Sequence, residues 1–392
     1  MGDESSAGGA GFQSPPPFSI SAAGQELAFY PGGADRREAL FALVDGARDQ
    51  LDVCFYIFDE DEIGTQFRDA LCRAAQRGVD VTLIIDRFGA AASDEFLRPL
   101  VESGGRYMCF SRRWTRRYLI RNHQKIVIAD RERAMIGGFN IADDYFADAA
   151  DEGWNDLAIG IEGSALEGLN EWFALLRSWT EKERTPYRVI RRAVRTREWG
   201  DDKVRWLIGG PTPSLSPWAR DISTALAQGQ RLDLIMAYFS PPRTLCRRIG
   251  RIARKGQTRL LMAAKSDNGA TIGATRALYS GLLESGACIW EFTPTKLHTK
   301  LIVLDDTVYL GSANFDMRSL YINLELVLKI TDPALAERMR EFVGEHLAVS
   351  ERITPELHRQ RATLFNRVRW WAGWVLVSVI DYTITRKLNL GI

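Results

Sequence analysis

The chain has 392 residues, of which 46% are hydrophobic and 26% are charged, which is typical of globular proteins. Its length suits two α/β lobes or one large domain. The formal net charge of +1 argues against a protein whose whole surface follows a nucleic-acid backbone, although local basic clusters can still bind anionic ligands. The five cysteines are scattered and form no CxxC pair, so free buried thiols in a reducing compartment are favoured over disulfides or a zinc site.

The amino terminus, GDESSAGGAGFQSPPPF, is small and acidic and lacks the basic start and apolar core of a signal peptide. We expect residues 1–24 to be a disordered leader. Elsewhere, no window reaches the roughly 20 apolar residues that a membrane-spanning helix needs.

The first ordered elements alternate between helix and strand. Residues 37–59 predict an amphipathic helix that runs into a buried strand. A second helix is expected from Gly64 to Arg77, where Gly78 stops it, and residues 79–86 form the next strand. A short strand and a loop then lead to a strand that contains His123.

The same order returns in the second half, with helices over 214–230 and 243–256 and strands over 232–239 and 257–264. Gly78 and Gly256 lie 178 residues apart, and His123 and His298 lie 175 apart, so the offset is nearly constant. This indicates a duplicated α/β fold. We expect lobes over 25–190 and 200–350, a linker near 185–203, a closing helix over 333–349 and a separate tail over 351–392.

Two matching motifs carry the chemistry, HQKIVIAD at 123–130 and HTKLIVLD at 298–305. In a strand, residues two apart share a face, so each histidine should lie beside a lysine, Lys125 or Lys300. A lone histidine on an apolar strand is more often structural. Here, two of only four histidines occupy equivalent places in duplicated motifs, which favours a functional role. A metal pair fits less well, because a cation accompanies each histidine.

A phosphodiester suits these residues, because its negative charge repels nucleophiles unless cations neutralise it. One imidazole can attack phosphorus while the other protonates the leaving oxygen, so no metal or other cofactor is expected. Both motifs lead to small-residue turns that end in asparagines, which can donate hydrogen bonds to phosphate oxygens. Downstream carboxylates are candidates for orienting the imidazoles, and the aspartates that end the motifs leave a structural and a catalytic role open. The asparagines are Asn140 and Asn314, and the downstream carboxylates are Asp156 and Glu325. The aspartates that end the motifs are Asp130 and Asp305.

Over about residues 26–350, these motifs resemble the phospholipase D superfamily. Further segments resemble bacterial cardiolipin synthases, namely Tyr56-Ile57-Phe58 with Asp61, the run at 121–125, Tyr238-Phe239 before Pro241, Ser266-Asp267, and 314–319 leading to Glu325. The resemblance implies two phospholipase D-like lobes, each a mixed sheet flanked by helices, related by a pseudo-twofold axis. It also implies a phosphatidyltransferase that joins two phosphatidylglycerols to cardiolipin and glycerol, with His123 as nucleophile and His298 as acid and then base; the reverse assignment of the two histidines is the alternative.

Transfer and hydrolysis differ only in which hydroxyl reaches the phospho-histidine, so a phospholipase D-type hydrolase is an open alternative. A nuclease or phosphodiesterase of the same superfamily is a further one. A lipid-binding scaffold with dead sites is disfavoured, because both H-x-K pairs are intact. The second turn departs from the usual pattern, with five residues between Asp305 and Gly311 against six between Asp130 and Gly137. The amino-terminal membrane helices common in these synthases have no counterpart, as in shorter, membrane-peripheral members.

A basic cluster enters the first motif, with Trp114 and Tyr118 interleaved. It favours an anionic-headgroup clamp and membrane-contacting lip over a merely solvated loop, although nucleic acid also binds arginines with aromatics. Its cations are Arg112, Arg113, Arg116, Arg117 and Arg121.

The tail contains an apolar run, Trp370–Ile380, flanked by cations, which predicts an interfacial helix; a helix docked on the second lobe is the alternative. We therefore expect a peripheral protein on the cytoplasmic face of the cell membrane, with phosphatidylglycerol and the membrane surface as partners. Neither nucleic acid nor an obligate protein partner is expected.

Overall fold

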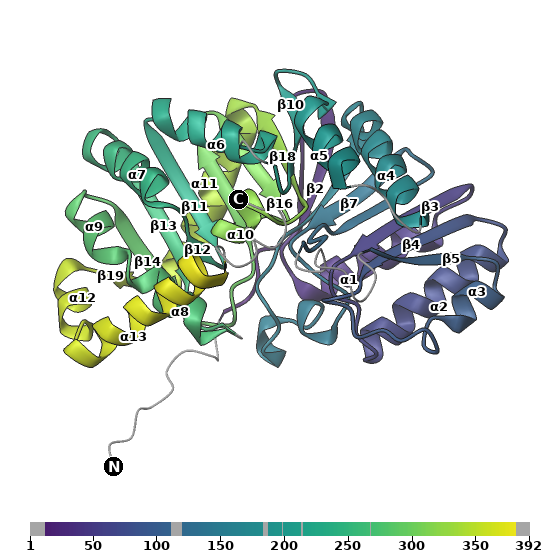
Figure 1. Cartoon of the computed structure of the whole chain (residues 1–392), viewed down its shortest axis with the longest axis horizontal. Coiled ribbons are helices and arrows are strands. Elements are labelled where there is room, and N and C mark those ends of the chain that lie inside the picture. The colour runs from purple at the N-terminus through teal and green to yellow at the C-terminus, as the bar shows by residue number, and fades with distance from the viewer. Residues whose placement is uncertain are drawn as a thin grey trace, which may run out of the picture.

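The computed structural model describes residues 12–110, 120–182, 187–197, 199–212, 215–266 and 268–381. Two α/β lobes lie side by side, each built on one large sheet with helices packed against it (Figure 1). The predicted duplicated α/β architecture is confirmed. Among the described residues, none of the helices is both long and apolar enough to cross a membrane.

The first lobe is built on an eight-stranded sheet. Its elements are β1 (Phe18–Ala22), β2 (Gln25–Tyr30), α1 (Gly33–Asp45), β3 (Gln50–Phe55), α2 (Glu62–Gln76), β4 (Asp80–Asp86), α3 (Arg98–Glu102), β5 (Arg106–Phe110), β6 (Ile126–Ala129), β7 (Arg133–Gly137), the 3-10 helices η1 (Asp143–Tyr145) and η2 (Ala149–Asp151), β8 (Ala158–Gly163), α4 (Ala165–Glu181) and α5 (Tyr187–Thr196).

The second lobe is built on a nine-stranded sheet, and β12 pairs with β17 apart from it. Its elements are β9 (Trp199–Gly200), β10 (Val204–Gly209), α6 (Pro217–Gln228), β11 (Arg231–Met236), β12 (Phe239–Ser240), α7 (Arg243–Lys255), β13 (Gln257–Ala263), α8 (Gly269–Arg276), α9 (Tyr279–Glu284), β14 (Cys288–Phe292), β15 (Lys300–Leu304), β16 (Thr307–Gly311), β17 (Phe315–Asp316), α10 (Met317–Tyr321), β18 (Glu325–Thr331), α11 (Pro333–Ala348), β19 (Glu351–Ile353), α12 (Pro355–Arg361), α13 (Leu364–Val375) and the π-helix η3 (Leu376–Asp381).

The two sheets have the same strand order. The first reads β1-β2-β8-β7-β6-β3-β4-β5, and the second, read from its β9 edge, is β9-β10-β18-β16-β15-β11-β13-β14 with β19 added. In each, three parallel strands (β3, β4 and β5, or β11, β13 and β14) adjoin an antiparallel set that includes the strand within the H-x-K motif, β6 or β15. The loops at the carboxyl ends of the parallel strands therefore converge on the segments that carry His123 and His298.

Local sequence explains where the helices begin and end. Asp61 caps α2 by accepting a hydrogen bond from the Gly64 amide at 2.8 Å, and Gly78 follows that helix with a φ of +94°, a conformation that suits glycine. Asp332 caps α11 in the same way, with Pro333 in its first turn. These ends agree with the predicted helices to within two residues.

The two lobes share an apolar core. Trp172 of α4 and Trp206 of β10 belong to one buried cluster that contains residues of both sheets, and the Trp206 indole donates to the Ala165 carbonyl at 2.7 Å. Each lobe also has its own cluster on the outer side of its sheet. Continuous burial across the boundary holds the lobes in a fixed relationship.

The predicted domain limits need two corrections. The disordered leader was placed at residues 1–24, but Phe18–Ala22 pairs with β2 as β1, and Phe12 packs against Phe292 with ring centroids 5.2 Å apart. Residues 1–11 lie outside the described residues. The second lobe was ended at residue 350, but Glu351–Ile353 extends its sheet as β19 beside β14. β1 is ordered by pairing with the adjacent β2, and β19 by pairing with the distant strand β14.

Candidate active site

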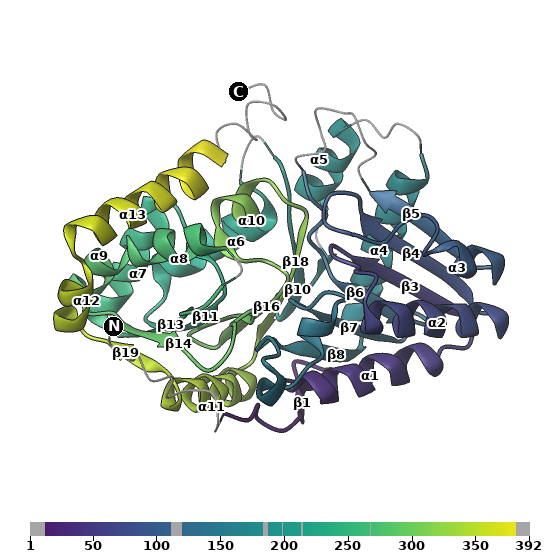
Figure 2. The same ribbon diagram turned by 90° about the horizontal axis from the view of Figure 1, so that it is seen from below.

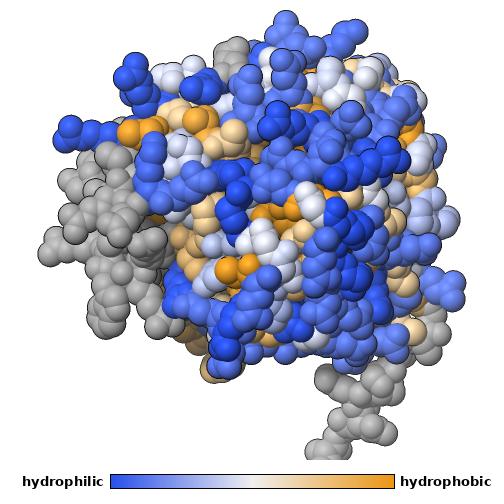
Figure 3. All heavy atoms as spheres, turned by 90° about the vertical axis from the view of Figure 1, so that its right-hand side faces the viewer, coloured by the Kyte–Doolittle hydropathy of each residue, from blue (hydrophilic) through white to orange (hydrophobic). Residues whose placement is uncertain are grey.

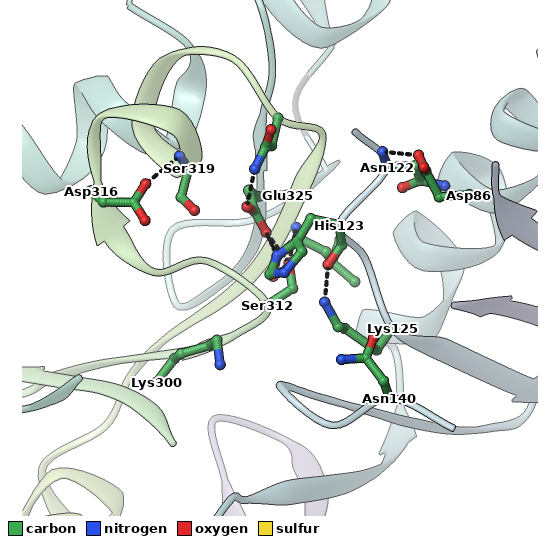
Figure 4. A network of polar contacts seen from close by, with 12 residues as sticks. Asp86, Asn122, His123, Lys125, Asn140, Lys300, Ser312, Asp316, Ser319 and Glu325 are labelled. Carbon is green, nitrogen blue, oxygen red and sulfur yellow. Dashed lines mark hydrogen bonds and ion pairs between the residues drawn. The ribbon is translucent and has the colours of Figure 1, made fainter. Parts of the chain in front are cut away.

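His123 does not lie in a strand of its own sheet. It lies in an extended segment before β6, where Asn122 forms a parallel bridge with Leu324 of the second lobe. The His123 amide donates to the Leu324 carbonyl at 2.9 Å. This pairing brings His123 Nδ1 to 3.1 Å from Oε2 of Glu325, the first residue of β18 (Figure 4). The carboxylate is fully buried and also accepts a hydrogen bond from the Ser312 hydroxyl at 2.6 Å.

His298 has the reciprocal arrangement. Its segment pairs with the first lobe through the bridge between Asn155 and Leu297, and its amide donates to the Asn155 carbonyl at 2.7 Å. His298 Nδ1 lies 2.6 Å from Oδ2 of the buried Asp156. Each imidazole is therefore oriented by a carboxylate of the other lobe, which leaves its Nε2 to face the reaction centre.

The two lysines complete the site. Lys125 Nζ donates to the His123 carbonyl at 2.7 Å, and Lys300 Nζ lies 3.0 Å from His298 Nδ1 and 3.2 Å from its Nε2. In Figure 4, the Lys300 side chain points from the second lobe towards the space beside His123 and Lys125. Two imidazoles and two ammonium groups thus surround one position that an anion could occupy.

Burial governs the proton affinities of these groups. Desolvation lowers the pKa of His123 to about 4 and that of His298 to about 3, and the neighbouring lysines add to both shifts. Burial also lowers the pKa of Lys125 to about 7. Burial alone would raise the pKa of Glu325, but His123 and Lys125 hold it below its usual range. Without a ligand, both imidazoles are therefore neutral at pH 7.

Comparisons with known proteins agree with this geometry. Residues 40–173 and 222–347 match the family described as "Cardiolipin synthase, PLD-like domain", one segment in each lobe. The chain belongs to this family. By this membership it is a phospholipase D-type phosphatidyltransferase, as the sequence predicted.

Relatives within the family are similar over most of their length. The chain is 28% identical over 338 residues to the major cardiolipin synthase of Bacillus subtilis strain 168, which covers 84% of this chain and 70% of the relative. It is 27% identical over 345 residues to cardiolipin synthase A of Pseudomonas entomophila strain L48, with 85% and 71% covered.

Two solved structures share the fold. The crystal structure of phosphatidylserine synthase from Haemophilus influenzae Rd KW20 has a TM-score of 0.70 at 15% identity and covers 93% of this chain and 97% of that one. Polyphosphate kinase from Porphyromonas gingivalis has a TM-score of 0.58 at 13% identity, with 86% and 49% covered. These likenesses support the two-lobed fold of the cardiolipin synthase-like family.

The predicted phosphate donors Asn140 and Asn314 are both buried at equivalent turns. Asn140 Oδ1 accepts from the Ile57 amide at 3.0 Å, and its Nδ2 donates to the Tyr145 hydroxyl at 2.9 Å. Asn140 therefore links the segment after β3 to the 3-10 helix η1 beside the site. The shorter second turn is absorbed before Asn314, because β6 and β7 close between Ala129 and Arg133, whereas β15 and β16 close between Leu304 and Thr307.

Asp130 and Asp305 lie at the far ends of β6 and β15 from the histidines. Asp130 Oδ1 accepts from the Arg48, Asp49 and Gln50 amides at 2.8–3.1 Å. Asp305 Oδ1 accepts from the Gln230 and Arg231 amides at 3.1 and 2.9 Å. These contacts assign both aspartates a structural role and correct their inclusion among the catalytic residues.

Sequence reasoning missed several residues that hold the site. Tyr145 and Trp154 pack against the His298 ring, with centroids 5.1 and 5.3 Å away. The fully buried Arg36 donates to the Asp156 carbonyl at 3.1 Å. His346 Nε2 lies 3.2 Å from Asn155 Nδ2, so a histidine of α11 supports the segment that pairs with His298. Only the position of Trp154 and Asn155 beside Asp156 offered a sequence signal.

Most of the predicted basic lip, namely Arg112, Arg113, Arg116 and Arg117, lies outside the described residues. Arg121 is described, and its guanidinium lies 4.2 Å from the Phe88 ring centroid and 6.0 Å from that of Tyr56. The Tyr56 ring in turn lies 4.9 Å from that of His123. Arg121 is thus separated from His123 by one aromatic ring, that of Tyr56.

Proposed function

We propose that the protein transfers a phosphatidyl group from one phosphatidylglycerol to a second, which yields cardiolipin and glycerol through a phospho-histidine. The observation that carries this proposal is the pair of reciprocal dyads, His123 with Glu325 and His298 with Asp156. Two oriented imidazoles beside two lysines supply a nucleophile, a general acid and charge neutralisation for one phosphodiester.

In the first step, His123 Nε2 attacks the phosphorus of the donor lipid. The bond between phosphorus and the headgroup glycerol oxygen breaks, and His298 Nε2 gives its proton to that oxygen, so free glycerol leaves. Glu325 stabilises the positive charge that develops on the His123 ring. The His123 side chain is 13% exposed and that of His298 only 6%, which supports His123 as the group that meets phosphorus.

In the second step, His298 is the base. It takes the proton from a headgroup hydroxyl of the second phosphatidylglycerol, whose oxygen bonds to phosphorus as the bond to His123 Nε2 breaks. Both histidines return to their starting states. Water in place of the lipid hydroxyl would give phosphatidic acid, which is the hydrolase alternative.

In the unoccupied site His298 is neutral, so the bound substrate must help to protonate it. Burial and Lys300 lower the pKa of His298 to about 3, so it carries no proton at pH 7 before an anion binds. A bound phosphodiester places negative charge between the lysines, which raises the proton affinity of both imidazoles. Acid catalysis by His298 is therefore coupled to occupancy of the site, and the unoccupied enzyme is poorly poised to cleave.

We also propose that the protein is peripheral on the cytoplasmic face of the cell membrane. Its five cysteines are all free, which suits a reducing compartment. Asn140 and Asn314, with Arg121 and the basic lip, are proposed to contact phosphate oxygens during the reaction.

The test is to incubate the purified protein with phosphatidylglycerol vesicles and to separate the lipid products. Cardiolipin with one equivalent of glycerol supports transfer. Phosphatidic acid with glycerol identifies a hydrolase. If neither cardiolipin nor phosphatidic acid forms in the presence of anionic phospholipid, the proposed transfer and the hydrolase alternative are both wrong.

A further inference from the structure

The helix α13 exposes an apolar stripe. Leu364, Val368 and Trp371 are spaced four and three residues apart, which places them on one helical face, and their exposed fractions are 81%, 58% and 63%. Phe365 and Leu376 widen the stripe and are also exposed. Of the ten large hydrophobic residues that are exposed in the described part of the chain, five therefore lie on α13 and at the start of η3.

The opposite face of α13 is fixed to the second lobe. Trp370 and Gly373 are buried against α8, and a side chain at Gly373 would come within 2.8 Å of the Ala270 carbonyl oxygen. The Trp370 ring stacks on His358 with centroids 5.4 Å apart. The docked arrangement of the tail is thus observed for one face of α13, while the other face is apolar and exposed to solvent.

This docking places α13 at the catalytic edge of the second lobe. By this term we mean the edge formed by the carboxyl ends of the parallel strands and the turn that ends in Asn314. Its support, α8, follows the carboxyl end of β13, and the Thr275 hydroxyl of α8 donates to the Phe239 carbonyl of β12 at 2.9 Å. The partner of β12 is Phe315–Asp316, which directly follows Asn314 of the catalytic turn. In Figure 2, α8, α10 and α13 lie towards one edge of the molecule.

The first lobe contributes a basic helix to the same edge. Figure 2 shows α5 at this edge, across from α13. Arg188, Arg192 and Arg195 of α5 are exposed, and Val189 is 46% exposed. On its inner side, Val194 lies against Gly210, as does Leu324, whose carbonyl accepts the His123 amide. The basic helix thus adjoins the segment that holds His123.

Other surfaces differ from this edge. The face of the first lobe that carries α2 and α3 is mostly hydrophilic, with hydrophobic residues showing between the polar ones (Figure 3). Val101 and Val349, which are 51% and 40% exposed, are single apolar residues on α3 and at the end of α11. In Figure 2, α11 lies at the edge opposite α13.

We propose that α13 and α5 form a membrane-seating face that holds the catalytic edge against an anionic bilayer. The apolar stripe of α13 enters the boundary between headgroups and acyl chains, while the α5 arginines contact anionic headgroups. Arg367 and Arg369 lie on either side of the stripe and are exposed, which suits guanidinium groups that reach headgroup phosphates. The inference rests on the proposed function, because a lipid substrate must pass from the bilayer into the site.

A bilayer fits this face better than a second protein chain. The apolar stripe is narrow, on a single helix, and arginines flank it, so a protein partner would have to desolvate several cations to cover it. A bilayer accepts both groups at once, since its apolar layer lies directly beneath anionic phosphates. The position of the two helices on either side of the catalytic segments also matches the direction from which lipid must arrive.

The first experiment measures flotation of the full chain with vesicles made of equal parts of phosphatidylglycerol and phosphatidylcholine. The double variant Val368→Glu, Trp371→Glu should lower the partition constant at least about tenfold. The matched control Val101→Glu, Val349→Glu places the same two charges at exposed apolar positions away from the face, and it should float like the wild type. Thermal unfolding of each variant shows that the fold is intact.

The second experiment tests the charged half of the face. The variant Arg188→Glu, Arg192→Glu should weaken flotation with the mixed vesicles but not with pure phosphatidylcholine vesicles, and added salt should reduce the difference. The control Arg73→Glu, Arg98→Glu changes net charge equally on α2 and α3 and should have little effect.

Flotation does not depend on turnover, so the result is separate from the test of the proposed function. Wild-type flotation by the α13 double variant, or equal loss in its control, would overturn the proposal. It would also be overturned if sedimentation velocity showed that the α13 variant dissociates a wild-type dimer while flotation is unchanged. The α13 face would then be an interface between copies of the chain.

Discussion

His123 Nδ1 and Glu325 Oε2 lie 3.1 Å apart, although the two residues are separated by 202 positions in the chain and belong to different lobes. The reciprocal pair, His298 and Asp156, spans 142 positions. The lobes differ in detail, since Ser312 supports Glu325 at the position where the first lobe has Gly138. The two dyads are therefore arranged pseudo-symmetrically, but the residues that support their carboxylates differ.

Replacing Glu325 with glutamine should lower kcat by about 10²- to 10⁴-fold with a small change in KM, because an amide can no longer stabilise the His123 imidazolium. Steady-state kinetics on phosphatidylglycerol measure both constants. Glu341→Gln on α11, whose side chain is 63% exposed, is the control and should behave like the wild type. A Glu325→Gln variant with a kcat within about twofold of the wild type would remove the dyad from the mechanism.

Gly138→Ala should damage the site without removing any catalytic group. A Cβ at this position would lie 2.7 Å from Asp156 Oδ1 and 2.9 Å from Lys300 Nζ, so the carboxylate and the lysine would have to move. Because misplacement by about 1 Å can cost about a hundredfold in rate, activity should fall by that order. Gly281→Ala, where nothing lies within 4 Å, should keep full activity. Similar rates for the two alanine variants would contradict the assigned geometry.

Asp130→Ala should lower the free energy of unfolding by about 1–3 kcal/mol, because three backbone amides lose their acceptor and alanine is strained at a φ of +55°. Asp130→Asn keeps an acceptor oxygen and tolerates that φ, so its loss should be smaller. Urea titration gives both values. Activity per folded molecule should be unchanged in each, and a large kcat defect in a stable Asp130→Asn protein would restore a catalytic role.

His346 should make the protein sensitive to acid. Burial lowers its pKa to about 4, so between pH 6.5 and 4 the unfolded chain binds a proton that the folded chain does not, and stability falls as pH falls. Buried Asp52, Asp86 and Asp316, whose pKa values burial raises to about 6, act in the opposite direction over this range. The contribution of His346 must therefore be isolated by a variant.

His346→Gln can keep both hydrogen bonds but does not titrate. The difference in free energy of unfolding between wild type and this variant should shift by about 3 kcal/mol between pH 7 and pH 4, in favour of the variant. Urea unfolding across this range measures it. A difference that does not change with pH would show that His346 is not buried as a neutral imidazole.

Much of the fold could be predicted from the sequence because the repeat is strong. The spacing of Gly78 and Gly256 and of the two H-x-K motifs is enough to infer two equivalent lobes, and the family comparison confirms them. Capped helices such as α2 and α11 follow from local residues. β1 and β19 were not predicted, because tertiary contacts order them. β1 pairs with the adjacent β2 and packs through Phe18 on Phe342 of α11, and β19 pairs with the distant strand β14.

The site was only partly predictable for a related reason. The histidines and lysines stand out as repeated motifs, and the structure places the predicted carboxylates Glu325 and Asp156 beside His123 and His298. Spacing along the chain cannot show which carboxylate reaches which histidine, since that depends on the bridges at Asn122 and Asn155 between lobes. Arg36 and His346 act through backbone or amide contacts, which leave no motif.

The exchange of carboxylates between lobes has a consequence for biosynthesis. A nascent chain that has emerged from the ribosome only as far as the first lobe holds His123 without Glu325 and Asp156 without His298. Neither half can then form a working dyad, even if its sheet folds as soon as it is made. Phosphatidyl transfer therefore begins only once β18 has been synthesised and has joined the second sheet, so that synthesis of the second lobe times the onset of activity.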